Sequence, residues 1–431
     1  MVKQMRLFFF AALLLVVAAT VNAQVTTSAM AGHVADKQGE DIISALVRVV
    51  HKPSGTTYNA VTNVDGRWAI QGMRVGGPYE VKITYVGFAD SVIEDITLQL
   101  GETYNLNVTM TEDVTELGEV VVTGTRSKFA AEKTGATTNI SNTQLTALPT
   151  VNRSISDIVR LSPYANGMGF AGGDGRSTNF TLDGANLNNN FGLSSSLPGG
   201  GTPISMDAID EVQVVVTPFD VRQTNFIGGG INAVTKSGTN TFKGTAYIYH
   251  NNENMHGNRI DNADLGERGT NRNTTYGFTL GGPIVKNKLF FFANAEYAKI
   301  PSVINRWRAS EDGVADPDNY ISRTTVADLQ KVRDFMMERY GYDTGSYTDF
   351  PADESNLKLL GRIDWNINDD HRLAVRYNYT KNTAWNPVNG SSTDADSRLP
   401  YNRLSQYSMA FANSMYAQDN NCLLYTSDAA D

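Results

Sequence analysis

Polar and apolar residues alternate along the last third of the chain, which predicts β-strands. In residues 357–367 the odd-numbered positions are apolar or glycine, and the even-numbered positions are polar except for Leu360. Residues 372–380 repeat the pattern after a short polar turn. Successive side chains of a strand point to opposite faces, so each segment would present one apolar and one polar face. A soluble antiparallel sheet alternates in the same way, and a single hairpin leaves both architectures open.

The spacing of the predicted strands distinguishes these architectures. Six segments are predicted as strands: 241–250, 272–281, 288–298, 356–367, 371–380 and 402–412. Their connections are in turn long, short, long, short and long, as in outer-membrane barrels, where periplasmic turns are short and external loops long. We therefore expect residues 281–288 to be a periplasmic turn and residues 300–355 an external loop with a helix near 327–340. Candidates for an aromatic girdle at the membrane interfaces, some of which could instead face the lumen, are Tyr247, Tyr249, Phe278, Phe291, Tyr297, Tyr377 and Tyr379.

Residues 28–111, which precede the strand-rich part of the chain, are predicted to form a small β-sandwich. Seven short candidate strands lie between residues 29 and 110: 32–35, 45–50, 57–62, 68–70, 79–85, 93–98 and 104–110. Turn signals separate them, at Asp65-Gly66 and at Gly76-Gly77-Pro78. Many short strands with regular turn signals are typical of a sandwich.

The first residues have the features of a signal peptide. Lys3 and Arg6 precede an apolar run from Leu7 to Ala19, and small or apolar residues at Val21 and Ala23 suit a cleavage site. The apolar run is shorter than the roughly 20 residues that a membrane-spanning helix needs. We expect residues 1–23 to be removed on export.

Composition limits the possible partners. The 431 residues carry a net charge of −9 and only 19% charged residues, which gives no support for a nucleic-acid-binding surface. The hydrophobic content of 41% excludes a bundle of membrane helices but not a β-barrel, whose strands are apolar at every second position. The chain has one cysteine, Cys422, so packing and strand pairing rather than disulfides must hold the exported protein together.

Residues 28–111 resemble the carboxypeptidase regulatory-like domain. The segments that carry the resemblance are 32–36, 45–49 and 62–70. That family is a transthyretin-like sandwich without catalytic machinery, and it often precedes outer-membrane receptors. The resemblance implies a non-catalytic module in the periplasm, and its grouping with carbohydrate-binding folds is only a weak indication about ligands.

Residues 128–238 resemble the plug domain of TonB-dependent outer-membrane receptors. The resemblance is carried by four ordered segments: a short helix that ends at a proline in 154–163, a strand that runs into a turn in 179–184, a buried strand in 209–216, and the glycine-rich segment 228–238. The stretch 217–223 is similar to the Oar-like group of these receptors. Siderophore receptors usually carry Arg-Gly-Pro and Tyr-Gly motifs in this interval, and the absence of both leaves a siderophore ligand in doubt. The residues 239–421 would then be the first part of the barrel.

The linker 112–127 contains the stretch that the family resemblance identifies as the TonB box. Its residues are Leu117, Gly118, Glu119, Val120, Val121, Val122 and Thr123. Three consecutive β-branched residues favour an extended backbone, and an unpaired extended segment can add a strand to another protein's sheet. Taken alone, the stretch is more simply interpreted as an ordinary edge strand or linker, and the domains that follow it reverse this preference.

The region after the plug is too short for a complete transporter barrel of this type. A plugged transporter of about 22 strands needs roughly 220 residues for its strands alone. We expect the chain to be a fragment whose strands form an open sheet with exposed edges. Residues 422–431 fit neither strand alternation nor a terminal barrel strand, and we interpret them as an anomalous tail similar to translated adapter sequence.

No catalytic, cofactor-binding or metal-binding residue is assigned. His250, Glu253 and His256 could in principle bind a metal, but a solvated loop is the simpler interpretation. Residues 171–177 lack the lysine and the strand–helix setting of a phosphate loop. Four plug charges are instead predicted to hold the plug to the barrel wall, with solvated surface positions as the alternative: Asp210, Glu211, Arg222 and Lys236.

The sequence therefore predicts a mainly β, TonB-dependent transporter of the Gram-negative outer membrane. Its expected partners are TonB, which would bind by strand addition, outer-membrane lipid and an unidentified extracellular ligand. The sandwich and the TonB box are expected in the periplasm. Two alternatives stay open: a structural or adhesive outer-membrane protein, and a secreted soluble protein with several sandwiches.

Overall fold

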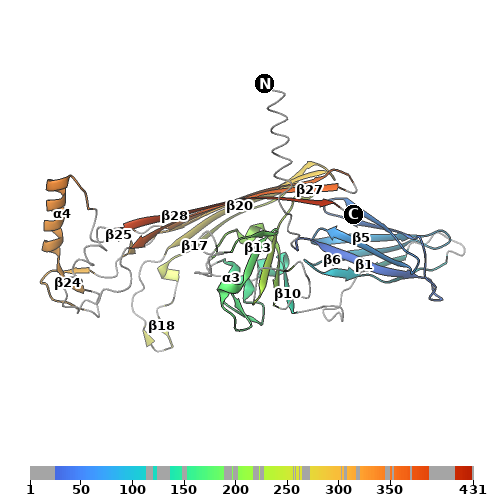
Figure 1. The fold of residues 1–431 in the computed structure, drawn as a ribbon, viewed down its shortest axis with the longest axis horizontal. Helices are drawn as coiled ribbons and strands as arrows, with labels where there is room; N and C mark the ends of the chain where they lie inside the picture. The colour runs from blue at the N-terminus through green and yellow to red at the C-terminus, as the bar shows by residue number, and fades with distance from the viewer. Residues whose placement is uncertain are drawn as a thin grey trace, which may run out of the picture.

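The structure of the chain, a computed structural model, contains a sandwich, a plug and one six-stranded sheet that lies against both (Figure 1). It describes residues 25–112, 120–123, 136–147, 153–188, 197, 202–216, 223, 228–255, 257, 259–261, 263–264, 272–301, 303–304, 308–316, 321–344, 350–351, 354–368, 371–387 and 413–429. The predicted signal peptide, residues 1–23, lies outside these ranges, as does the predicted strand 402–412.

The sandwich has two sheets packed face to face. One sheet consists of β4 (Arg67–Met73), β1 (Ser28–Ala35), β7 (Thr103–Asn105) and β8 (Val108–Thr109). The other has the order β3 (Thr56–Val61), β2 (Leu46–His51), β5 (Gly76–Thr84), β6 (Ser91–Leu98) and β9 (Val120–Thr123). Alternate residues of β2 and β5 are completely buried, so the inner faces of the strands form one apolar core.

Two sequence predictions for the sandwich need correction. The predicted strand 104–110 is two short strands, because Leu106 and Asn107 interrupt it, and both parts pair with β1. Gly76 to Pro78 are not a turn but the start of β5, where Gly76 pairs with Leu98 across an irregular register. Glycine and proline signalled a break in regular pairing there rather than a reversal of the chain.

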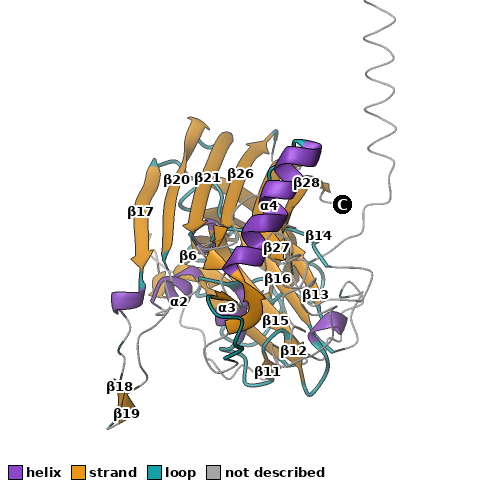
Figure 2. Cartoon of the chain, turned by 90° about the vertical axis from the view of Figure 1, so that its left-hand side faces the viewer, coloured by secondary structure: helices purple, strands orange, loops and turns teal. Residues whose placement is uncertain are grey.

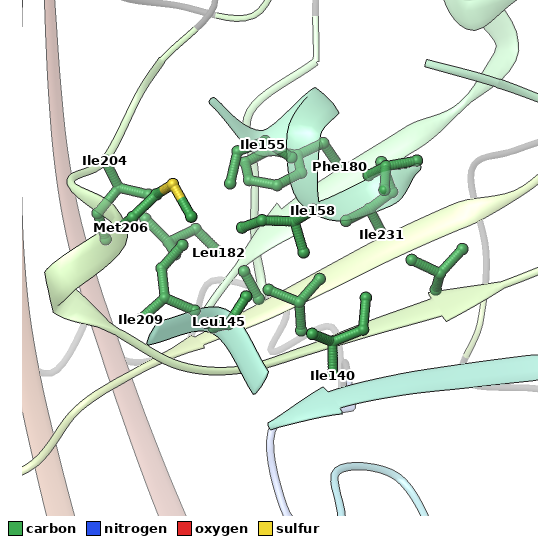
Figure 3. Packing of buried hydrophobic residues seen from close by; sticks show 14 of the residues in the cluster. Ile140, Leu145, Ile155, Ile158, Phe180, Leu182, Ile204, Met206, Ile209 and Ile231 are labelled. Carbon is green, nitrogen blue, oxygen red and sulfur yellow. The ribbon is translucent and has the colours of Figure 1, made fainter. Parts of the chain in front are cut away.

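The plug is built on a five-stranded sheet with the order β10 (Thr137–Ser141), β15 (Ile209–Val215), β16 (Gly230–Thr235), β13 (Asn179–Leu182) and β14 (Ala185–Asn186). The short helices α2 (Asn142–Ala147) and α3 (Ile155–Val159) cover it. The side chains of sheet and helices meet in one apolar core, which Figure 3 shows from close by. The predicted helix and strands of this region are confirmed.

The third part is a sheet of six antiparallel strands, seen side by side in Figure 2. In sheet order these strands are β17 (Lys243–Asn251), β20 (Asn273–Val285), β21 (Leu289–Ile300), β26 (Glu354–Asn366), β27 (His371–Pro387) and β28 (Asn413–Ala429). We call this sheet the wall. It is open, with β17 and β28 as its edges.

Five of the six predicted wall strands are confirmed, and the sixth, 402–412, lies outside the described residues. The structure places the sixth strand at β28, paired with β27 from Pro387–Asn413 to His371–Ala429. The residues from 422 to 429, which were interpreted as a tail outside the strands, therefore continue this strand. Strand pairing uses backbone N–H and C=O groups, so a segment without clear alternation can still extend a sheet.

The two ends of the wall carry different structures. The sandwich lies at one end, where the short turns of the wall are found, and α4 (Val326–Tyr340) lies at the other (Figure 1). Thr325 caps α4 by accepting a hydrogen bond from the Asp328 backbone N–H, and Gly341 ends it in the left-handed conformation. The predicted helix near 327–340 is thus confirmed. No helix among the residues described above is long and apolar enough to cross a membrane.

Candidate functional site

The candidate site is the interface between the plug and the polar face of the wall, which we call the plug–wall interface. Along β26 the polar side chains are buried, with Lys358 5%, Arg362 7% and Asp364 3% exposed. The alternate side chains on the opposite face are open, with Leu359 38% and Ile363 47% exposed. The predicted division of this strand into an apolar outer face and a polar inner face is confirmed.

Leu360, the one break in the alternation of β26, has a specific role in this interface. It lies on the inner face, is 4% exposed and belongs to the apolar core of the plug. Phe292 of β21 is the other wall residue in that core. The plug therefore contacts the wall through a small apolar patch surrounded by charged and polar groups.

The first polar group at the interface is centred on Asp183, directly after β13. Its two carboxylate oxygens accept hydrogen bonds from the backbone N–H (2.9 Å) and the hydroxyl (2.7 Å) of Thr235. Asp183 has a positive φ of 49°, a conformation that Asp tolerates better than most residues. The resulting turn places the carboxylate against the wall. Arg376 Nε lies 3.6 Å and Arg362 Nη1 4.0 Å from it.

Arg362 joins the plug and wall through both ends of its guanidinium. Nε and Nη2 each donate a 2.8 Å hydrogen bond to Asp364 two residues along the same strand, a bidentate pair. Nη1 donates to the backbone carbonyl of Thr235 in the plug at 2.6 Å. The wall thus supplies its own counter-charge to the arginine, while the plug supplies a carbonyl and the more distant carboxylate of Asp183.

The second polar group is centred on Glu296 of β21. Lys358 Nζ donates to one carboxylate oxygen at 2.7 Å, and the other accepts from Tyr247 Oη at 2.7 Å and Ser205 Oγ at 2.8 Å. Ser205 belongs to the plug, whereas the other three are wall residues. The side chain of Tyr247 reaches Glu296 by crossing Gly277, where a Cβ atom would overlap the tyrosine ring.

Tyr247 and Tyr249 also contact a plug arginine. The guanidinium carbon of Arg153 lies 5.0 Å and 4.2 Å from the centroids of their rings, and Arg153 forms an ion pair with Asp207. Burial opposes the charge on Arg153, but the nearby Asp207 and the tyrosines outweigh it and raise its pKa. Both tyrosines therefore face the plug, so of the two predicted possibilities they take the lumenal one and are not part of an outer aromatic girdle. The register places the other five candidates on the outer face with Leu359 and Ile363: Phe278, Phe291, Tyr297, Tyr377 and Tyr379.

The sandwich contacts the plug through the backbone of Leu100. Its N–H donates to Glu211 at 3.0 Å, and its carbonyl accepts from Gln213 at 2.6 Å and Asn139 at 3.1 Å. Leu100 itself is fully buried and packs with Val234 of the plug. The sandwich is thereby held against the plug sheet at β15 and β10.

The sandwich also binds the short turns of the wall. The backbone N–H of Asn240 donates to the Pro53 carbonyl at 2.8 Å, and Asn366 donates to the Thr56 hydroxyl at 3.0 Å. Arg372 of β27 lies over the ring of Tyr58 at 4.0 Å. A polar cavity remains where the three parts meet, lined by residues that include Arg74, Asp210, Arg362, Asp364 and Arg372.

Three of the four charges predicted to anchor the plug are described. Glu211 accepts a hydrogen bond from the sandwich, and Asp210 lines the polar cavity together with Arg362 and Asp364 of the wall. Asp210 and Lys236 make no salt bridge among the contacts that the described residues form; burial raises the pKa of Asp210 and lowers that of Lys236. Arg222 lies outside the described residues. The anchoring role falls instead to Asp183, which the sequence offered only as the end of a predicted strand.

The predicted TonB box is described in part. Val120–Thr123 form β9, which pairs in parallel with β6 of the sandwich. Leu117, Gly118 and Glu119 lie outside the described residues. Within the ranges that the structure covers, no three His, Cys, Asp or Glu side chains are close enough to hold a metal ion, and His256 is not among them.

Two family models match parts of this chain. Residues 29–111 match the carboxypeptidase regulatory-like domain, and residues 234–306 match an outer membrane beta barrel domain. The resemblance of the sandwich is therefore confirmed, and the strands that follow the plug are those of an outer-membrane barrel. The chain is accordingly an outer-membrane protein.

The TonB-dependent transporter Oar of Myxococcus xanthus is 25% identical over 378 residues, which cover 82% of this chain and 33% of the relative. Among solved structures, the siderophore receptor PirA of Acinetobacter baumannii (TM-score 0.44, 17% identity) and the transporter YddB of Escherichia coli (TM-score 0.45, 13% identity) are similar. Each alignment covers 68% of this chain and 37% of the other. The chain thus spans about a third of the length of these proteins, and its resemblance to the Oar-like group is confirmed.

Proposed function

We propose that this chain, a relative of the Oar-like TonB-dependent receptors, acts as an energised transporter that takes up a ligand across the outer membrane. The observation that best supports the proposal is the polar character of the plug–wall interface. Buried ion pairs contribute little net stability compared with apolar contacts, because desolvation offsets their attraction. A plug held mainly by such pairs can be displaced and seated again.

The charges at the interface support a defined resting position. Asp183 is directed at Arg376 and Arg362, and Ser205 is directed at Glu296. Truncating one partner leaves a buried charge without compensation, so polar contacts fix the register of two surfaces strongly. The plug would therefore return to one position after each transport event.

Energy would enter through the segment 117–123. In this proposal it is the TonB box, and the periplasmic domain of TonB binds it by strand addition. The sandwich and the short turns of the wall share one end, which would be the periplasmic end. The long connection that holds α4 would face outward and take part in ligand capture.

Binding of the purified periplasmic domain of TonB tests this assignment. Val121→Pro in the full chain removes one backbone N–H from the segment and should abolish binding, whereas Val121→Thr keeps a β-branched residue and should retain it. Equal binding by both variants would mean that the segment is not recognised as a strand.

A structural or adhesive outer-membrane protein is the second candidate. It is supported by the exposed apolar side chains of α4, with Phe335 57% and Tyr340 67% exposed at the end of the wall opposite the sandwich. An adhesive protein would keep its surface-binding activity in cells without TonB, whereas a transporter would lose uptake there.

A further inference from the structure

We propose that the β6 edge of the sandwich is a resting site for the TonB box, from which the segment must be released before a pull reaches the plug. This inference rests on the proposed function of the segment. It assigns to the sandwich a surface whose occupant is residues 120–123 of the same chain. Three properties of that edge support the proposal: its pairing with β9, its burial, and the attachment of the sandwich to the plug and the wall.

The pairing is in register over the whole of β9. The parallel partners run from Ser91–Val120 to Glu94–Thr123. Without β9, β6 would be the outermost strand of its sheet, because β5 lies on its other side. An outermost strand presents unpaired N–H and C=O groups that accept another strand. In this chain the segment expected to bind TonB already occupies them.

The burial of β6 marks the same stretch. Ser91, Val92 and Ile93 are 8%, 4% and 4% exposed, whereas alternation returns after Glu94, with Asp95 and Thr97 exposed and Ile96 and Leu98 buried. A strand with one face on a core should bury only every second residue. Ile93 belongs to the sandwich core and Val92 does not. Val92 is therefore buried on the opposite face of the sheet, in the part of β6 that pairs with β9.

The edge is also limited in length. Asp95 has a positive φ of 59°, and the pairing of β6 with β5 is irregular across this position. Such irregularities end a regular ladder. The paired stretch ends at Glu94, so the site accommodates four residues, the length of β9.

The chain keeps the segment near this edge. The Ala89 N–H donates to the Thr111 carbonyl at 2.9 Å, and Phe88 pairs with Glu112, so the linker leaves the sandwich beside the start of β6. A short tether of this kind gives an effective concentration on the order of millimolar. Rebinding of the segment to β6 would thus compete with TonB.

Because the sandwich is attached to the wall and the plug, β9 must be released from β6 before a pull can act on the plug alone. The sandwich is hydrogen-bonded to the wall at Pro53 and Thr56 and to the plug at Leu100. A pull on the segment while it is paired with β6 would load the sandwich and its contacts with the wall. Only after β9 separates from β6 would the pull pass along the chain to residue 136 and the plug.

Hydrogen exchange of the full-length protein in detergent tests the resting site. The amides of residues 120–123 that face β6, which are every second one, should be protected, and Val92→Lys, which places a charge at a buried position outside the sandwich core, should remove that protection. Thr97→Lys on the exposed part of the same strand is the matched control and should leave it unchanged. Unprotected amides in the unaltered protein would overturn the resting site.

Affinity for the periplasmic domain of TonB tests the competition. If the segment is free about a tenth of the time, Val92→Lys should raise the affinity on the order of tenfold, because apparent affinity scales with the competent fraction. A disulfide between Ser91→Cys and Val120→Cys, in a Cys422→Ser background, should lower it until a reductant is added. Unchanged affinity in both variants would overturn the competition.

The two proposals fail in different ways. If the TonB domain binds neither the unaltered protein nor Val92→Lys, the segment is not a TonB box and the proposed function is wrong, along with the competition. Protection of alternate amides within residues 120–123 that depends on Val92 would then still show that β6 holds the segment. If TonB binds and the amides are unprotected, the proposed function stands and the resting site does not.

Discussion

Asp183 of the plug lies 3.6 Å from Arg376 of the wall, and the same carboxylate accepts two hydrogen bonds from Thr235. One side chain therefore closes a turn inside the plug and pairs with the surface outside it. The carboxylate is almost completely buried, and so is the guanidinium. Displacing the plug must separate this pair, which makes it a suitable place to test how the plug is held.

Replacing Asp183 by Asn should loosen the plug on the wall. Arg376 would remain buried beside a neutral amide, which should cost about 2–4 kcal/mol. The free energy of local opening, measured by hydrogen exchange of the β13 and β16 amides, should fall by this amount. Asp174→Asn is the control, since that carboxylate is exposed and pairs only with Arg176 nearby in sequence. Equal effects of the two variants would contradict the anchoring role.

The Glu296–Lys358 pair should show strong coupling in a double-mutant cycle. Lys358→Met alone leaves the buried carboxylate without its cation, and Glu296→Gln alone leaves the ammonium unpaired. Each single change should destabilise the wall by about 3 kcal/mol, and the double variant should recover much of that loss. Urea unfolding in detergent measures all four proteins. Additive losses would mean that the two groups act independently.

Two neighbouring leucines of β26 distinguish the loss of the plug contact from a general destabilisation of the strand. Leu360→Ala removes a wall side chain from the plug core and should destabilise the plug by about 2–4 kcal/mol. Leu359→Ala changes the outer face of the same strand and should leave the plug unaffected. The same hydrogen-exchange measurement on β13 and β16 reports both. A plug response to Leu359→Ala as large as that to Leu360→Ala would place the contact elsewhere.

The sandwich should lose stability in mild acid because of His51. Burial, together with the nearby Arg74, lowers its pKa from 6.5 to about 3. The unfolded chain binds a proton below pH 6.5 that the folded sandwich does not, so stability falls as the pH falls from 6.5 towards 3. Between pH 7.5 and pH 5 the loss should be about 2 kcal/mol, measured by the protection of the β2 amides.

Two histidine variants check the origin of that loss. His51→Gln should remove most of the pH dependence, because the side chain at this position no longer titrates. His33→Gln, at an exposed position near Asp41, should retain it. A pH dependence that survives in His51→Gln would assign the effect to another group.

The sequence was sufficient where a residue pattern determines the structure directly. Alternation in residues 357–367 correctly placed Lys358 and Arg362 on the inner face and Ile363 on the outer face. The sequence also predicted α4 and the plug strands β13 and β15. These features depend on local periodicity and on neighbouring residues, which a single sequence contains.

Contacts between distant segments could not be read from the pattern. The wall partners of Asp183, Arg362 and Arg376, follow it by more than 170 residues, and no local feature distinguishes its carboxylate from that of Asp210. Tyr247 looked like a girdle residue because its strand gives no clear inner face; its direction follows from the gap that Gly277 leaves across the sheet. Leu360 was visible as a break in alternation, and its burial in the plug explains that break. The pairing of β9 with β6 depends on which sheet edge is free, a property of the folded sandwich.

Uptake by living cells tests the central claim most directly. Cells that produce the full-length protein, or the same protein without residues 117–123, would be grown with a defined mixture of glycans, peptides and ferric chelates, in strains with and without TonB. The proposed function predicts that at least one compound is depleted only when both the segment and TonB are present, while surface binding persists without the segment. Depletion that is the same in all four strains would contradict an energised transporter.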